Sequence, residues 1–103
     1  NLPSSYVIHT VGPVYRDGQH GEPELLERCH RRVMEIANEN GLETLAFPAI
    51  SCGVYGYPVE DAARIAIGTV ADEMSGDSTV GHVRFVLFTD DVREVFERVL
   101  LNL

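Results

Sequence analysis

Three short apolar runs alternate along this chain with three segments whose apolar residues recur every three or four positions. The runs occupy residues 6–13, 44–50 and 82–89, and they contain the β-branched and aromatic residues that are typical of strands. The recurring patterns are typical of amphipathic helices. A β-α-β-α-β-α order places a helix between successive strands, so it predicts an α/β protein with parallel strands.

Turn and cap residues mark where the three helices begin and end. Pro23 suits the first turn of the first helix, and Gly41 lies just past its end. The second helix is expected to begin near Pro58. The last one is expected to have Asp91 as its N-cap, because Glu94 follows three residues later.

The middle strand carries no alternation of apolar and polar residues, which suits a strand buried on both faces. Pro48 lacks a donor for the sheet, so we expect the strand to end or bulge there. Open sheets of this kind bind ligands beyond the carboxyl ends of their strands. The segments expected at those ends are residues 12–15, 51–57 and 88–91.

Charge limits the classes of partner. The 103 residues, enough for one domain, carry 8 basic and 16 acidic side chains, for a net charge of −8. This balance argues against nucleic-acid binding through a broad cationic surface. It still permits a small anion held by main-chain dipoles. No apolar run is long enough to span a bilayer, so no membrane partner is expected.

The cysteines and histidines suggest little chemistry by themselves. Cys29 and Cys52 are too few for a disulfide framework and lack zinc-site spacing, which predicts reduced thiols in a cytoplasmic protein. His9 is expected within a strand as a packed residue, and His20 and His30 at the surface. No metal-binding cluster is visible. The acidic runs at residues 22–27 and 90–91 suit helix caps and solvated faces.

The segment 51–57, SCGVYGY, stands between the second strand and the second helix. Gly53 and Gly56 can adopt positive φ, and successive N–H groups in such a loop form an anion-binding concavity beside a helix N-terminus. Tyr55 and Tyr57 could stack on a sugar or hydrogen-bond to it, so the loop suits a diphosphate with a sugar attached. Alternatively, the glycines only shape a tight turn and the tyrosines pack. No lysine follows Gly56, which excludes a P-loop.

Three collinear motifs carry a family resemblance. YVIHTVGPVY, then LAFPAISCGVYGYP followed by AA, then VRFVLF resemble the successive signatures of the macrodomain family, over nearly all of the chain. The similarity is strongest to bacterial and mitochondrial members that hydrolyse ADP-ribose esters. It implies a three-layer α/β/α fold around a mixed sheet, ADP-ribose as the ligand, and no metal or organic cofactor.

The resemblance also implies roles by position. Tyr57 would lie by the distal ribose, and Phe88 would stack on adenine. Cys52 stands where relatives commonly have threonine. The residues implied to surround the diphosphate are Ser51, Cys52, Gly53, Val54, Tyr55 and Gly56.

The resemblance implies that residues 1–103 are the C-terminal portion of a single macrodomain. The family's N-terminal strands, its first glycine-rich loop, an acidic residue that reads adenine, and an Asn and an Asp near the distal ribose find no counterpart here. We therefore expect the chain to be part of a longer domain, and no catalytic residue is assigned within it.

Three functions follow as hypotheses. The first is an enzyme that hydrolyses ADP-ribose esters, removing acetate from O-acetyl-ADP-ribose or mono-ADP-ribose from acidic side chains of proteins. The second is a module that binds ADP-ribose on proteins without cleaving it. The third is a hydrolase that uses Cys52 as nucleophile, because a helix N-terminus can lower the pKa of a thiol.

Overall fold

The computed structural model describes residues 12–48, 50, 56–87 and 89–102. Its elements follow in the order α1 (Glu22–Glu39), β1 (Thr44–Pro48), α2 (Val59–Met74), β2 (His82–Val86) and α3 (Asp90–Leu101). The predicted alternation is confirmed for this part of the chain. Of the strand predicted at residues 6–13, residues 6–11 lie outside the described residues and the last two adopt no regular structure. None of the helices described is long and apolar enough to cross a membrane.

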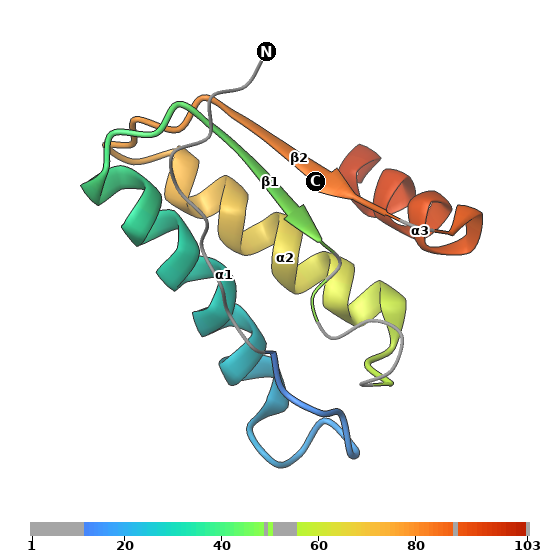
Figure 1. Cartoon of the computed structure of the whole chain (residues 1–103). Coiled ribbons are helices and arrows are strands. Elements are labelled where there is room, and N and C mark those ends of the chain that lie inside the picture. Colours follow the sequence, from blue (N-terminus) through green and yellow to red (C-terminus); the bar gives the residue numbers. More distant parts are fainter. Residues whose placement is uncertain (1–11, 49, 51–55, 88, 103) are drawn as a thin grey trace.

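β1 and β2 form a parallel pair, as predicted, with Thr44 opposite His82 and Pro48 opposite Val86. Figure 1 shows α1 and α2 lying along one face of this pair, with α3 after β2 and beside α2. Both strands therefore end side by side, and the segments that follow them leave from the same edge of the sheet. β1 ends at Pro48, where the missing N–H was expected to stop it.

The two faces of β1 are not equally buried. Phe47 is buried and Leu45 half-buried against the helices, whereas Thr44, Ala46 and Pro48 are exposed. The prediction of a strand buried on both faces is therefore wrong within the described residues. Successive side chains of a strand point to opposite faces, and the described helices cover only one of them.

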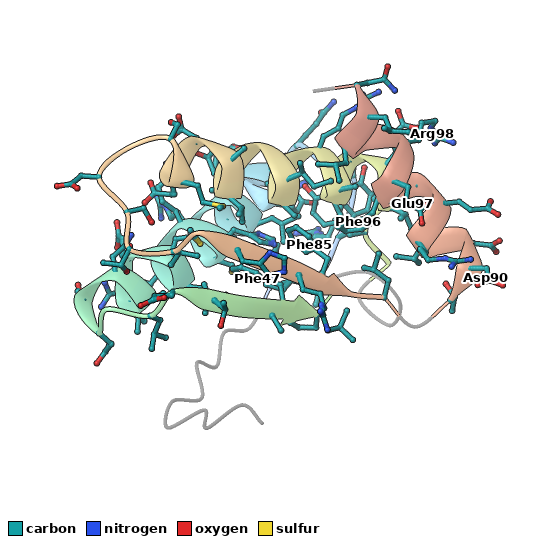
Figure 2. All side chains as sticks on the ribbon, turned by 90° about the horizontal axis from the view of Figure 1, so that it is seen from above. Phe47, Phe85, Asp90, Phe96, Glu97 and Arg98 are labelled. Atoms are coloured by element: carbon teal, nitrogen blue, oxygen red, sulfur yellow. The ribbon has the colours of Figure 1, made fainter. Side chains whose placement is uncertain are left out.

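A row of rings joins the helices to the sheet. The ring centroids of Phe47 and Phe85 lie 5.6 Å apart, and those of Phe85 and Phe96 lie 5.4 Å apart. At the other end of the row, the His30 ring lies 5.4 Å from that of Phe47. Figure 2 shows the three phenylalanines between the strands and the helices. The row passes from α1 through both strands to α3, so these four elements share one core.

The helix ends mostly follow the predicted signals. Pro23 lies in the first turn of α1, and Gly41, just past its end, has a φ of 65°. The predicted cap of α3 is wrong, because Asp91 lies within the helix. The helix begins one residue earlier, and the Thr89 side chain accepts the hydrogen bond of the Val92 N–H at 3.3 Å.

His30 is buried, with 1% of its surface exposed, so the predicted surface position is wrong. Its neighbours Val33 and Met34 are buried on the same side of α1. The Nδ1–H donates to the Leu26 carbonyl at 2.9 Å, and Nε2 finds no partner among the described residues. Burial lowers the pKa of the imidazole below its ordinary 6.5, although the Leu26 carbonyl acts in the opposite direction.

We expect the stability to fall as the pH drops below 6.5, the ordinary pKa of histidine. The unfolded chain then binds a proton at His30 that the folded protein excludes, which costs up to about 1.4 kcal/mol per pH unit. The loss continues until the pH reaches the lowered pKa of the folded state. Urea unfolding of the wild type and His30→Gln between pH 8 and pH 5.5 measures it. If the free energy of unfolding depends on pH in the same way in the two proteins, His30 is not the group responsible.

Candidate functional site

The loop between β1 and α2 is the predicted ligand site, and the structure describes its two ends. The strand ends at Pro48, and Gly56 and Tyr57 lead into α2. Gly56 is exposed with a φ of 71°, which confirms the predicted positive φ. A Cβ built there would meet none of the described residues within 4 Å, so the positive φ, and not crowding by those residues, is what favours glycine here.

Most of the predicted site residues lie outside the described residues. They are Ser51, Cys52, Gly53, Val54, Tyr55 and Phe88, and the same holds for His9. Their predicted roles therefore stay predictions. Where the loops begin is nevertheless defined: Pro48 and Val86 are opposite each other, so the segments that follow β1 and β2 start side by side.

Tyr57 is buried, with 3% of its surface exposed. It packs with Leu26 and Ala62, and its ring centroid lies 4.8 Å from that of Tyr15. Two of the three predicted edge segments, residues 12–15 and 51–57, are thereby brought into contact. The hydroxyl of Tyr57 is buried without a hydrogen-bond partner in the described part of the chain. The ring contributes to the core, and the predicted distal-ribose contact stays a prediction.

The Tyr57 hydroxyl remains protonated at any physiological pH. Burial, followed by the negative charges of Asp61 and Glu22, raises its pKa to about 12. A protonated phenol is a hydrogen-bond donor, and the described residues supply no acceptor for this one. Because this donor directly follows Gly56, it lies at the end of the predicted anion-binding loop.

The first turn of α2 has N–H groups that no described side chain caps. Such a turn attracts anions, but Glu60 and Asp61 also lie in it and compete for the same dipole. The charge of Glu60 is offset by two arginines: it pairs with Arg64, and Arg98 Nη2 lies 3.0 Å from its other oxygen. The electrostatic penalty for an anion at this helix start is correspondingly reduced.

One buried acidic residue escaped the sequence analysis. Glu22, expected in a cap or on a solvated face, is 3% exposed, and its carboxylate accepts hydrogen bonds from the loop before α1. The available signal was its position, a glutamate between Gly21 and Pro23 at a helix start. Proline and glycine there indicate a tight entry into the helix, which needs an acceptor for its N–H groups.

The sequence showed no metal-binding cluster, but the fold brings ligand atoms of Asp17, His20 and Glu22 within 4.8 Å of one another. His20 Nδ1 already lies 2.8 Å from the Asp17 carboxylate. Both Glu22 oxygens accept main-chain hydrogen bonds. A cation would have to displace these partners, so the cluster functions as a loop clamp.

Comparison with known proteins places the geometry in context. The model of the Macro domain family matches residues 1–66. A macro domain-containing protein of Chlorobaculum tepidum is 48% identical over 99 residues, which are 96% of this chain and 58% of that protein. An O-acetyl-ADP-ribose deacetylase of Citrobacter koseri is 45% identical over 100 residues, which are 97% of this chain and 56% of the relative.

Solved structures agree. An Oceanobacillus iheyensis macrodomain mutant with ADPR superimposes with a TM-score of 0.89 and 38% identity, over 98% of this chain and 54% of the other. The Trypanosoma brucei macrodomain in complex with ADP-ribose gives a TM-score of 0.80 and 34% identity, over 89% of this chain and 38% of that one. The predicted three-layer fold class is confirmed, and the described residues form the sheet and one helical layer. The chain spans about half the length of the relatives it matches.

We expect Tyr57→Phe to leave the free energy of unfolding unchanged or to raise it by up to about 1 kcal/mol, since no described group bonds to the buried hydroxyl. Tyr57→Ala should lower it by about 3 kcal/mol or more, because the ring fills the core between α1 and α2. Urea unfolding of both variants measures the difference. A loss for Tyr57→Phe comparable to that of a broken buried hydrogen bond would show that the hydroxyl has a partner.

Proposed function

The chain belongs to the macrodomain family, and from this premise we propose that it binds ADP-ribose at the loop between β1 and α2 and hydrolyses ADP-ribose esters. One observation carries the proposal. The segment that resembles the family signature leaves the carboxyl end of a parallel strand and enters an uncapped helix start through Gly56. Solved macrodomains that superimpose on this chain contain ADPR or ADP-ribose.

The diphosphate is held by main-chain N–H groups. Ser51, Cys52, Gly53, Val54, Tyr55 and Gly56 form the cradle, and the first turn of α2 adds its dipole. The positive φ of Gly56 supports this role, because a left-handed residue is one part of the main-chain conformation that forms an anion-binding concavity. Residues 51–57 include no lysine or arginine, so the loop needs no cationic side chain.

The two ends of the ligand extend to either side of the diphosphate. Tyr57, the residue that ends the loop, lies toward the distal ribose. Phe88 stacks on adenine from the segment that follows β2. The register that sets Pro48 opposite Val86 supports this arrangement, because it starts both segments at one edge of the sheet.

The reaction is ester hydrolysis. A water oxygen adds to the acyl carbon, the bond from that carbon to the ribose oxygen breaks, and the ribose oxygen takes up a proton. The products are ADP-ribose and acetate, or ADP-ribose and an acidic side chain. The bound diphosphate assists the water, and the loop supplies position and oriented dipoles. No residue of this chain is given the role of moving protons.

We expect calorimetric titration to show ADP-ribose binding at least about tenfold tighter than AMP or ATP, a difference of about 1.4 kcal/mol. AMP lacks the diphosphate and distal ribose, and ATP places a third phosphate where the ribose belongs. Equal affinity for the three ligands, or no binding at all, would overturn the proposed function.

Gly53→Glu places a carboxylate in the cradle and should abolish the binding seen in that titration. Gly76→Glu is the matched control, since it adds the same charge beyond the far end of α2, at an exposed position. Undiminished affinity in Gly53→Glu would place the ligand elsewhere on the protein.

Cys52→Thr separates hydrolysis by water from a cysteine mechanism. We expect this variant to keep the release of acetate from O-acetyl-ADP-ribose within about threefold of the wild type, because the main-chain cradle survives the change. A Cys52 nucleophile would instead make the loss complete. If wild type and variant both bind ADP-ribose but neither releases acetate, binding is upheld and hydrolysis by this chain is overturned.

A further inference from the structure

Both carboxylate oxygens of Glu22 accept main-chain hydrogen bonds from the loop that precedes α1. Its Oε2 accepts hydrogen bonds from the N–H groups of Arg16 at 2.8 Å, Asp17 at 3.1 Å and Gly18 at 3.1 Å. Its Oε1 accepts the N–H of His20 at 2.7 Å. Four main-chain donors thus converge on one carboxylate, which fixes the conformation of residues 16–20.

The Glu22 carboxylate stays charged at neutral and mildly acidic pH. Burial by itself would raise the pKa of Glu22, but the main-chain hydrogen bonds outweigh it and hold the pKa well below the ordinary 4.5. The clamp therefore does not loosen at mildly acidic pH.

The clamped loop holds Tyr15. The Arg16 N–H belongs to the peptide group that joins Tyr15 to Arg16, so the shortest of the Oε2 hydrogen bonds acts directly beside this residue. Gly18 lies close to the same ring: a Cβ at this position would lie 3.2 Å from the Tyr15 hydroxyl. Gly18 has a φ of 80°, a conformation that glycine adopts without strain.

Tyr15 in turn packs on the residue that ends the ligand loop. The centroids of the Tyr15 and Tyr57 rings lie 4.8 Å apart with 59° between their planes. Tyr57 is joined to Gly56 on one side and leads through Pro58 into α2 on the other. Hence a chain of direct contacts runs from the Glu22 carboxylate to the end of the loop.

We propose that Glu22 is a positioning residue for the ligand site, holding Tyr15 against Tyr57 so that Gly56 keeps the conformation that binds the diphosphate. The role rests on the proposed function for its ligand, but the positioning itself is a property of the protein without ligand. Glu22 does not touch the ligand. If Glu22 served stability alone, its substitution would lower the melting temperature but leave the loop conformation and the affinity for the ligand unchanged.

Glu22→Gln tests the clamp, because an amide has only one acceptor oxygen and turns an NH₂ group toward the loop N–H donors. Glu24→Gln is the matched control: Glu24 lies in the same first turn but is exposed. We expect Glu22→Gln to weaken ADP-ribose binding about tenfold at a temperature where both variants are folded, within the range of coupling through packed side chains. In the absence of ligand, the NMR amide resonances of Gly56 and Tyr57 should shift in Glu22→Gln and not in Glu24→Gln.

Gly18→Ala tests the same path without altering Glu22. The added methyl group pushes on Tyr15, so this variant should reproduce both effects even if Glu22→Gln fails to fold. Gly41→Ala is its control: φ is 65° there too, but the new Cβ would meet nothing within 4 Å. Both alanines carry backbone strain, and only the first reaches the Tyr15–Tyr57 contact.

The two readouts separate this inference from the proposed function. If the wild type binds ADP-ribose and Glu22→Gln and Gly18→Ala bind it equally well, the positioning role is overturned. If the wild type does not bind ADP-ribose, the proposed function fails. The amide resonances then decide whether the positioning role holds. Unshifted Gly56 and Tyr57 resonances in both variants overturn the positioning role, and shifts that the two controls lack uphold it.

Discussion

The contact between Phe47 and Phe85 is the interaction on which the remaining packing depends. These rings face each other across the parallel strands, and each also touches a helix: Phe47 reaches His30 of α1, and Phe85 reaches Phe96 of α3. α2 packs against both outer helices. Because the strands pair in the register that sets these two rings opposite each other, their carboxyl ends coincide, and the two loops proposed to bind the ligand leave from one place.

Burial and charge are arranged unevenly around that edge. The acidic first turn of α2 is partly neutralised by Arg64 and Arg98. The Glu22 carboxylate is instead stabilised by hydrogen bonds from main-chain N–H groups. Although the net charge of the chain is −8, the electrostatic repulsion of an anion at the start of α2 is therefore weaker than the composition suggests. Local hydrogen bonding, and not the overall charge, decides what such a site can accept.

Much of the fold could be predicted because its signals are local. Apolar spacing predicted all three described helices, and Pro48 predicted the end of β1. The positive φ of Gly56 followed from residue type. The surface prediction for His30 failed because a residue distant in sequence, Phe47, packs on it. Glu22 is instead buried by its own loop, whose N–H groups converge on it through tertiary geometry that residue type does not reveal. The cap of α3 missed by two residues, because Thr89 and Asp91 are both good caps and local pattern cannot choose between them.

The outer face of the strand pair restricts what can be layered upon it. Arg84 of β2 lies there with Ala46 of β1 opposite, and both residues are exposed. A covering helix could pack closely over Ala46, but burying Arg84 would demand a carboxylate or several carbonyl acceptors in return. Whatever completes the third layer must therefore be apolar where it packs on Ala46, and must offer carboxylate or carbonyl acceptors where it covers Arg84.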